Sequence, residues 1–201
     1  MKKLFVAITA LAVIGMAGNA LAIGLTVGGG GGVLLPLTDF ADMYKLGYGF
    51  GGGATIGVLP YLGIDVDFAY YLGMKNKAII GTPPNPSTPE DFYKQTMTAI
   101  TFGAHYNIIS GGTFVPYAGG GGGFYMIKTK EDATGNEYTI DTCNKPGFYF
   151  GGGLNYFISD KMCINFATKL HIVMVGDDYF GADVSKLMFM TIGGGIGYAV
   201  M

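Results

Sequence analysis

The sequence contains no arginine and no tryptophan, and charged residues make up only 13% of it. A typical soluble domain has about 25% charged residues, so this chain has too little charge to cover the surface of a secreted soluble protein. Its formal net charge is −2, which becomes 10 − 14 = −4 when Lys2 and Lys3 are left out. Because nucleic-acid-binding domains present a basic surface, the composition excludes nucleic acid as a partner.

Long apolar runs are also missing. After the N-terminal segment no stretch of about 18 uninterrupted apolar residues occurs, which excludes a membrane-spanning helix. The N-terminus itself reads Met1-Lys2-Lys3, then an apolar stretch to residue 17, then Ala20-Leu21-Ala22. This order is typical of a secretory signal peptide. We expect residues 1–22 to be removed and residues 23–201 to form one domain of 201 − 22 = 179 residues; the alternative is a retained N-terminal anchor.

Glycine, in contrast, is abundant, with 36 residues in 201, against an average of about 7%. Eight stretches alternate apolar side chains with small or polar ones, a pattern that predicts strands with two unlike faces. Phe, Tyr, Ile, Leu and Val occupy one face, and glycine occupies most of the other. The predicted strands are residues 23–33, 48–58, 63–71, 96–108, 114–127, 147–158, 162–175 and 186–200.

The connections between these strands alternate in length. Short ones follow the second, fourth and sixth strands, while longer ones follow the others, including a third long loop from Lys128 to Pro146. Most charged residues lie in the connections, so the apolar faces are nearly free of charge. Such a pattern predicts an eight-stranded antiparallel up-and-down transmembrane β-barrel with lipid outside and glycine inside. A soluble lipocalin-like barrel requires the inverse pattern, with apolar side chains inside and polar side chains outside.

Two segments resemble those of a known family. Residues Val115-Pro116-Tyr117 and the glycine run that follows resemble a strand common in small bacterial outer-membrane β-barrel proteins, and Ile192–Val200 resembles their C-terminal assembly signal. The resemblance covers the whole predicted mature chain. The family that it indicates is that of the eight-stranded OmpA/OmpX-like barrel domains. It implies a location in the bacterial outer membrane, insertion by the barrel-assembly machinery, and contact with outer-membrane lipid and lipopolysaccharide.

Cysteine is scarce, and only Cys143 and Cys163 are present. An oxidising cell envelope permits disulfides. The predicted barrel, however, separates these residues by about one membrane thickness, whereas a disulfide needs Cα atoms within about 7 Å. We expect free or intermolecular thiols, with Cys163 buried in the lumen.

Five charged or titratable residues are predicted to face the lumen: Asp65, Asp67, His105, Lys169 and His171. We expect Asp65 to meet His105, and Lys169 to be held by Asp65 or Asp67, because an unpaired ammonium in a narrow lumen is costly. Our first interpretation is a polar network that closes the barrel, and the alternative is a constriction for ions or solutes. No serine lies beside either histidine to act as a nucleophile, and the spacing suits no metal. No catalytic, metal-binding or cofactor-binding residue is predicted.

The glycine runs do not predict a phosphate-binding loop, because no Gly-Lys-Ser/Thr sequence follows them. The function expected first is a structural or surface-interaction role without enzymatic activity, in which external loops contact lipopolysaccharide or other surfaces. The first alternative is a narrow pore for water, ions or small solutes. The second is a lipid-modifying enzyme, which would need a nucleophile beside His105 or His171. The ligand and the oligomeric state stay open.

Overall fold

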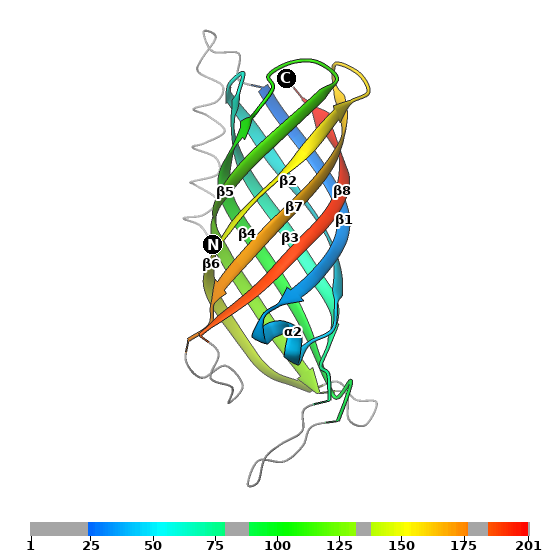
Figure 1. Cartoon of the computed structure of the whole chain (residues 1–201), viewed down its shortest axis with the longest axis vertical. Coiled ribbons are helices and arrows are strands. Elements are labelled where there is room, and N and C mark those ends of the chain that lie inside the picture. The colour runs from blue at the N-terminus through cyan, green and yellow to red at the C-terminus, as the bar shows by residue number, and fades with distance from the viewer. Residues whose placement is uncertain (1–23, 79–88, 132–137, 177–184, 201) are drawn as a thin grey trace.

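Eight strands close into one barrel in the computed structural model, which describes residues 24–78, 89–131, 138–176 and 185–200, with backbone alone at 138–142. Neighbours in the chain pair antiparallel, and β8 closes the barrel onto β1 (Figure 1). The elements are β1 (Gly24–Leu37), α2 (Asp39–Met43), β2 (Gly47–Leu59), β3 (Leu62–Lys75), β4 (Tyr93–Asn107), β5 (Phe114–Glu131), β6 (Tyr138–Phe157), β7 (Met162–Met174) and β8 (Lys186–Ala199). The predicted eight-stranded antiparallel up-and-down barrel is confirmed.

The predicted signal peptide, residues 1–22, lies outside the described residues, as do parts of the second, third and fourth long loops and Met201. Within the described part of the chain, no helix has the length and apolar character to span a membrane.

The strands have two unlike faces, as the alternation predicts. Phe50, Phe102 and Phe150 are exposed on the outer face. Their neighbours Gly51 and Gly151 line the interior instead. A closed barrel pairs the backbone N–H and C=O groups of every strand. The apolar outer face can therefore lie in lipid without leaving backbone groups unpaired.

Inward glycine allows the sheet to curve tightly. A Cβ atom at Gly30 would lie 2.2 Å from the carbonyl oxygen of Gly194, and one at Gly151 would lie 2.1 Å from that of Thr168. Backbones crowd together on the concave side of a small barrel, because eight strands leave room for little more than side chains. Glycine at these positions therefore permits the small radius.

The prediction of a long third loop from Lys128 to Pro146 was wrong. Strand β5 continues to Glu131 and pairs with β6, which begins at Tyr138. The alternation persists here, since Ile127 is buried while Lys128 is exposed. Charge on the outer face had suggested a loop, but a strand that extends beyond the lipid can carry lysine outward into water.

Candidate functional site

An apolar cluster fills the end of the barrel that carries the long connections, which we call the loop end; we call the cluster the plug. Its buried members are Leu34, Phe40, Tyr44, Met74, Met97, Ala99, Tyr125, Ile127, Val173, Val175, Leu187 and Phe189. The Phe189 ring lies 6.4 Å from that of Phe40 and 6.2 Å from that of Tyr125, both edge-on. The plug closes the lumen at the loop end, and the sequence analysis did not predict it.

Helix α2 contributes Phe40 to the plug by folding into the mouth of the barrel (Figure 1). A helix of five residues is not stable alone in water, and the side chain of Thr38 makes no capping bond to it. Thr38 also has a φ of 52°, a conformation that costs about 1–3 kcal/mol for a residue other than glycine. The burial of Phe40 against Tyr44 and Phe189 therefore holds α2 in place.

Four charged side chains tie the segment after α2 to the second long connection; we call them the loop clasp. The ammonium of Lys45 lies 2.5 Å from Glu90 and 2.7 Å from Asp91, and Lys75 lies 3.0 Å from Asp91. These hydrogen bonds, first from Lys45 and then from Lys75, hold the pKa of the Asp91 carboxyl below its usual range. The bond to Asp91 raises the pKa of Lys45 above its ordinary value. Exposed ion pairs contribute little to stability because water screens them, so the clasp chiefly aligns the two connections.

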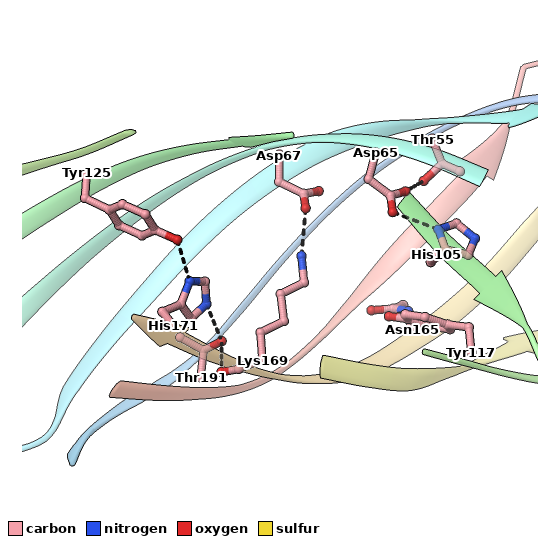
Figure 2. Close-up of polar contacts among 10 residues, drawn as sticks. All are labelled: Thr55, Asp65, Asp67, His105, Tyr117, Tyr125, Asn165, Lys169, His171 and Thr191. Carbon is pink, nitrogen blue, oxygen red and sulfur yellow. Dashed lines mark hydrogen bonds and ion pairs between the residues drawn. The ribbon is translucent and has the colours of Figure 1, made fainter. Parts of the chain in front are cut away.

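Below the plug, the lumen holds the polar residues that the sequence analysis singled out, in three groups along the barrel (Figure 2). The group nearest the short turns is centred on Asp65. One of its oxygens accepts a hydrogen bond from Thr55 Oγ1 at 2.6 Å, and the other lies 2.8 Å from His105 Nδ1. The side chains of Asp65 and His105 are largely buried, with exposed fractions of 16% and 13%.

The second group is an ion pair across the lumen. The Nζ atom of Lys169, on β7, donates to Asp67 Oδ2, on β3, at 2.7 Å. The same ammonium lies 4.9 Å from the centre of the Tyr149 ring, within reach of a cation–π attraction. The aliphatic stem of Lys169 can extend across the lumen because the facing wall is glycine backbone. Each charge is thus neutralised inside the barrel.

His171, the fifth predicted residue, has different partners and lies against the plug (Figure 2). Its Nδ1 is 2.8 Å from the Tyr125 hydroxyl, and its Nε2 is 3.3 Å from Thr191 Oγ1. Thr191 Oγ1 also donates to the carbonyl of Lys169 at 3.4 Å. The imidazole also stacks on Phe189 at 4.6 Å. His171 therefore joins the polar lumen to the plug.

A chamber of about 960 Å³ occupies the other half of the lumen. Its lining runs from the short turns, at Pro60, Gly112 and Ser159, past Asp67 and Lys169 to Tyr71 and Thr191. None of the buried plug residues is among the described residues that line it. The chamber is therefore closed at the loop end and reaches the turns at the other, which we call the turn end. Cys163 lines it and is a free thiol.

The lumenal side chains neutralise one another's charges and exclude water. This arrangement does little to activate any one of them for a reaction. In the part of the chain that the structure describes, no cluster of three or more His, Cys, Asp or Glu residues could hold a metal ion. The partners that sequence reasoning missed are Thr55, Tyr125, Tyr149 and Thr191. Their only signal is position, because each occupies an inward place on its strand and the pairing across the barrel depends on its stagger.

The chain matches a known family over most of its length. Residues 8–199 match the family model for the outer membrane protein β-barrel domain. No curated protein sequence matches the chain.

Solved structures share the fold at low sequence identity. Neisserial surface protein A is 13% identical, with a TM-score of 0.57, over 87% of this chain and 96% of that one. Ail, the attachment invasion locus protein of Yersinia pestis, is 15% identical, with a TM-score of 0.54, over 88% and 98%. OprG from Pseudomonas aeruginosa is 14% identical, with a TM-score of 0.57, over 89% and 96%.

Proposed function

This chain belongs to the outer membrane protein β-barrel domain family, and from that premise we propose that it acts through its external surface, without conducting solutes or catalysing a reaction. The observation that carries the proposal is the plug. An outer-membrane barrel with long external loops and short periplasmic turns has its loop end outside the cell. The plug therefore closes the lumen on the external side.

Opening a path through the plug would be costly. Phe40, Tyr125 and Phe189 are each fully buried, and burying a large apolar side chain contributes about 1.5–3 kcal/mol. A conducting state that exposed all three would be rarely populated. A narrow pore remains the second candidate, favoured by the chamber of about 960 Å³, and it would require α2 to move out of the mouth.

The absence of an enzymatic role is supported by the surroundings of the histidines. A catalytic nucleophile must reach both its base and the substrate. The hydroxyl that lies nearest His171 belongs to Tyr125, and the two residues are 2% and 0% exposed. His105 is engaged by Asp65. A substrate would have no access to the buried pair of His171 and Tyr125.

The external surface, in contrast, carries most of the accessible charge. Strands β5 and β6 extend past the apolar band, and the loop clasp orders the neighbouring connections. Contact with lipopolysaccharide or with another surface would take place here. The barrel would then serve as the anchor that displays this surface.

Planar-bilayer recording of the refolded protein tests the proposal. We expect no discrete conductance steps from the unchanged chain. Phe40→Ala combined with Phe189→Ala removes two rings of the plug and should produce steps, which also shows that protein inserts under these conditions. Discrete steps from the unchanged chain would instead establish the pore.

A further inference from the structure

Three polar side chains of the chamber form a cluster that the proposed surface role does not use; we call it the amide cluster. They are Tyr117 on β5, Asn155 on β6 and Asn165 on β7, and all three line the chamber. Asn165 Nδ2 donates to the Tyr117 hydroxyl at 2.9 Å and to Asn155 Oδ1 at 2.7 Å. Figure 2 shows Asn165 and Tyr117 beside His105. The amide cluster is therefore a fixed array that three neighbouring strands hold together.

The amide cluster keeps hydrogen-bonding atoms that no other described residue uses. Within the described ranges, no group accepts the Tyr117 hydroxyl proton, accepts from the Asn155 amide or donates to the Asn165 carbonyl oxygen. The cluster therefore offers donors and an acceptor side by side to whatever occupies the chamber. A hydroxyl group both donates and accepts hydrogen bonds, so a ligand with several hydroxyl groups suits this array.

The charged groups on the strands around the chamber are already paired. Asp65 accepts a hydrogen bond from Thr55 and lies 2.8 Å from His105 Nδ1. Asp67 accepts from Lys169 at 2.7 Å. An ionic ligand would have to displace one of these partners, whereas an uncharged ligand would leave all of them in place.

The wall next to the amide cluster is bare backbone. Asn165 pairs in register with Gly195, Gly195 pairs with Gly30, and Gly30 pairs with Gly51. These three glycines line the chamber, and their N–H and C=O groups bond within the closed sheet. The wall therefore presents flat Cα–H surface. A pyranose ring has matching chemistry, because its hydroxyl groups lie around its edge and its C–H groups cover its faces.

The size of the chamber suits one small molecule. Eight-stranded barrels are either filled by side chains or hold one small ligand, and ligand pockets measure about 300–1,000 Å³. This chamber measures about 960 Å³, because glycine occupies so much of its wall. The rings of Tyr117 and His105, whose centres lie 5.3 Å apart, add flat surface on the polar side.

We propose that the chamber is a binding site for a neutral sugar of one or two pyranose rings, with the amide cluster bonded to its hydroxyl groups and the glycine wall against a ring face. The sugar enters and leaves through the turn end, because the plug fills the loop end. The inference goes beyond the proposed external role. It assigns a second function to the opposite end of the barrel, and this function needs no conduction.

NMR titration of the isotope-labelled, full-length mature chain in phosphocholine micelles tests the proposal. Methyl glucoside and maltose are the probes, and we expect saturable shifts of the side-chain amide signals of Asn155 and Asn165. Glucosamine and glucuronate carry opposite charges on a similar ring and should both bind more weakly than methyl glucoside. The absence of saturable shifts with both neutral sugars would overturn the site. Equal or tighter binding of either charged sugar would overturn the choice of a neutral ligand.

One pair of variants tests the amide cluster. Tyr117→Phe removes one hydroxyl, and we expect about two- to tenfold weaker binding of methyl glucoside, the ordinary contribution of one hydrogen bond. Tyr198→Phe is the matched control, because Tyr198 is exposed on the outer face at the turn end and should leave binding unchanged. Equal affinity of the two variants would overturn the role of the cluster.

A second pair tests the chamber. Ala167→Phe places a ring inside it and should abolish binding, since Ala167 lines the chamber. Ala118→Phe adds the same ring on the outer face, where Ala118 is exposed, and should bind as the unchanged chain does. Undiminished binding by Ala167→Phe would overturn the location of the site.

Two controls keep these outcomes interpretable. The backbone amide spectrum shows that each variant is folded. Conductance stays the separate test of the proposed function. A chain that conducts and still binds sugar would overturn that function alone, and a chain that neither conducts nor binds sugar would overturn this inference alone.

Discussion

At the scale of single residues, the ion pair between Lys169 and Asp67 lies in a lumen that is only partly hydrated, with side-chain exposures of 29% and 32%. Replacing Lys169 by Met leaves the carboxylate without its ammonium, and we expect a loss of about 1–3 kcal/mol in the free energy of unfolding. Adding Asp67→Asn should recover part of it, with a coupling of about 1 kcal/mol. Urea unfolding in lipid vesicles measures each variant.

Asp65 provides the matched control for this cycle. Its partners are Thr55 and His105, so Asp65→Asn combined with Lys169→Met should give losses that nearly add. Strong coupling of Lys169 to Asp65, with none to Asp67, would mean that the ammonium chooses the other carboxylate.

The loop clasp gives a prediction about pH. Hydrogen bonds from Lys45 and Lys75 lower the pKa of Asp91. A pKa that is lower in the folded than in the unfolded state gives a stabilising contribution that is present above the unfolded value, about 3.9, and is lost as the pH falls through the folded value. Carbon NMR of the Asp91 carboxyl should therefore show a midpoint below about 3.9. Lys45→Gln should raise that midpoint while Lys186→Gln leaves it in place; an unchanged midpoint in Lys45→Gln would refute the clasp.

At the scale of elements, adjacent glycines on one strand should differ in their tolerance of a methyl group. A Cβ at Gly30, on the inner face of β1, would lie 2.2 Å from a backbone oxygen, whereas one at Gly29 would lie 3.3 Å from its nearest neighbour. Gly30→Ala should cost about 1–3 kcal/mol through overpacking, and Gly29→Ala much less. Gly121 and Gly122 repeat the comparison on β5, at 2.1 and 3.5 Å. Unfolding in vesicles measures all four variants, and equal costs within each pair would show that crowding on the inner face is not the cause.

The same alternation explains which elements could be predicted from the sequence. A strand with an apolar face and a glycine face specifies a barrel in lipid, and the number of strands and their ends at the turn side followed from it. The ends at the loop side did not follow, because Lys128 and Lys130 look the same in a loop and on the outer face of a strand above the lipid. Charged side chains therefore indicate where a strand leaves the hydrocarbon layer, and they do not indicate where the strand ends.

Helix α2 could not be predicted because nothing local favours it. Its five residues follow a strained Thr38, and what holds it is the contact of Phe40 with Phe189, which lies far along the chain. The ion pair between Asp67 and Lys169 spans 102 residues and was foreseen only as a choice between two aspartates. Deciding between them requires the stagger of the strands, which is a property of the closed barrel.

At the scale of the whole molecule, the residues that the structure describes leave the lumen open at the turn end and fill it at the loop end. The plug closes the loop end, and the chamber reaches the turns at the periplasmic end. Ala167 lines the chamber. The variant Ala167→Cys should react with a small charged thiol reagent supplied from the turn side and not from the loop side. Cys143→Ser and Cys163→Ala remove the native thiols. Asp39→Cys, which is exposed at the loop end, should show the reverse preference in oriented vesicles.

Removing the plug should abolish this sidedness. With Phe40→Ala and Phe189→Ala added, the cysteine at position 167 should become reactive from the loop side as well, because the two rings that meet at the mouth are gone. If the position reacts from the loop side while the plug is intact, at a rate close to that of Asp39→Cys, then water and solutes already pass the plug. The barrel would then be an open pore, and the chamber would be one half of its path.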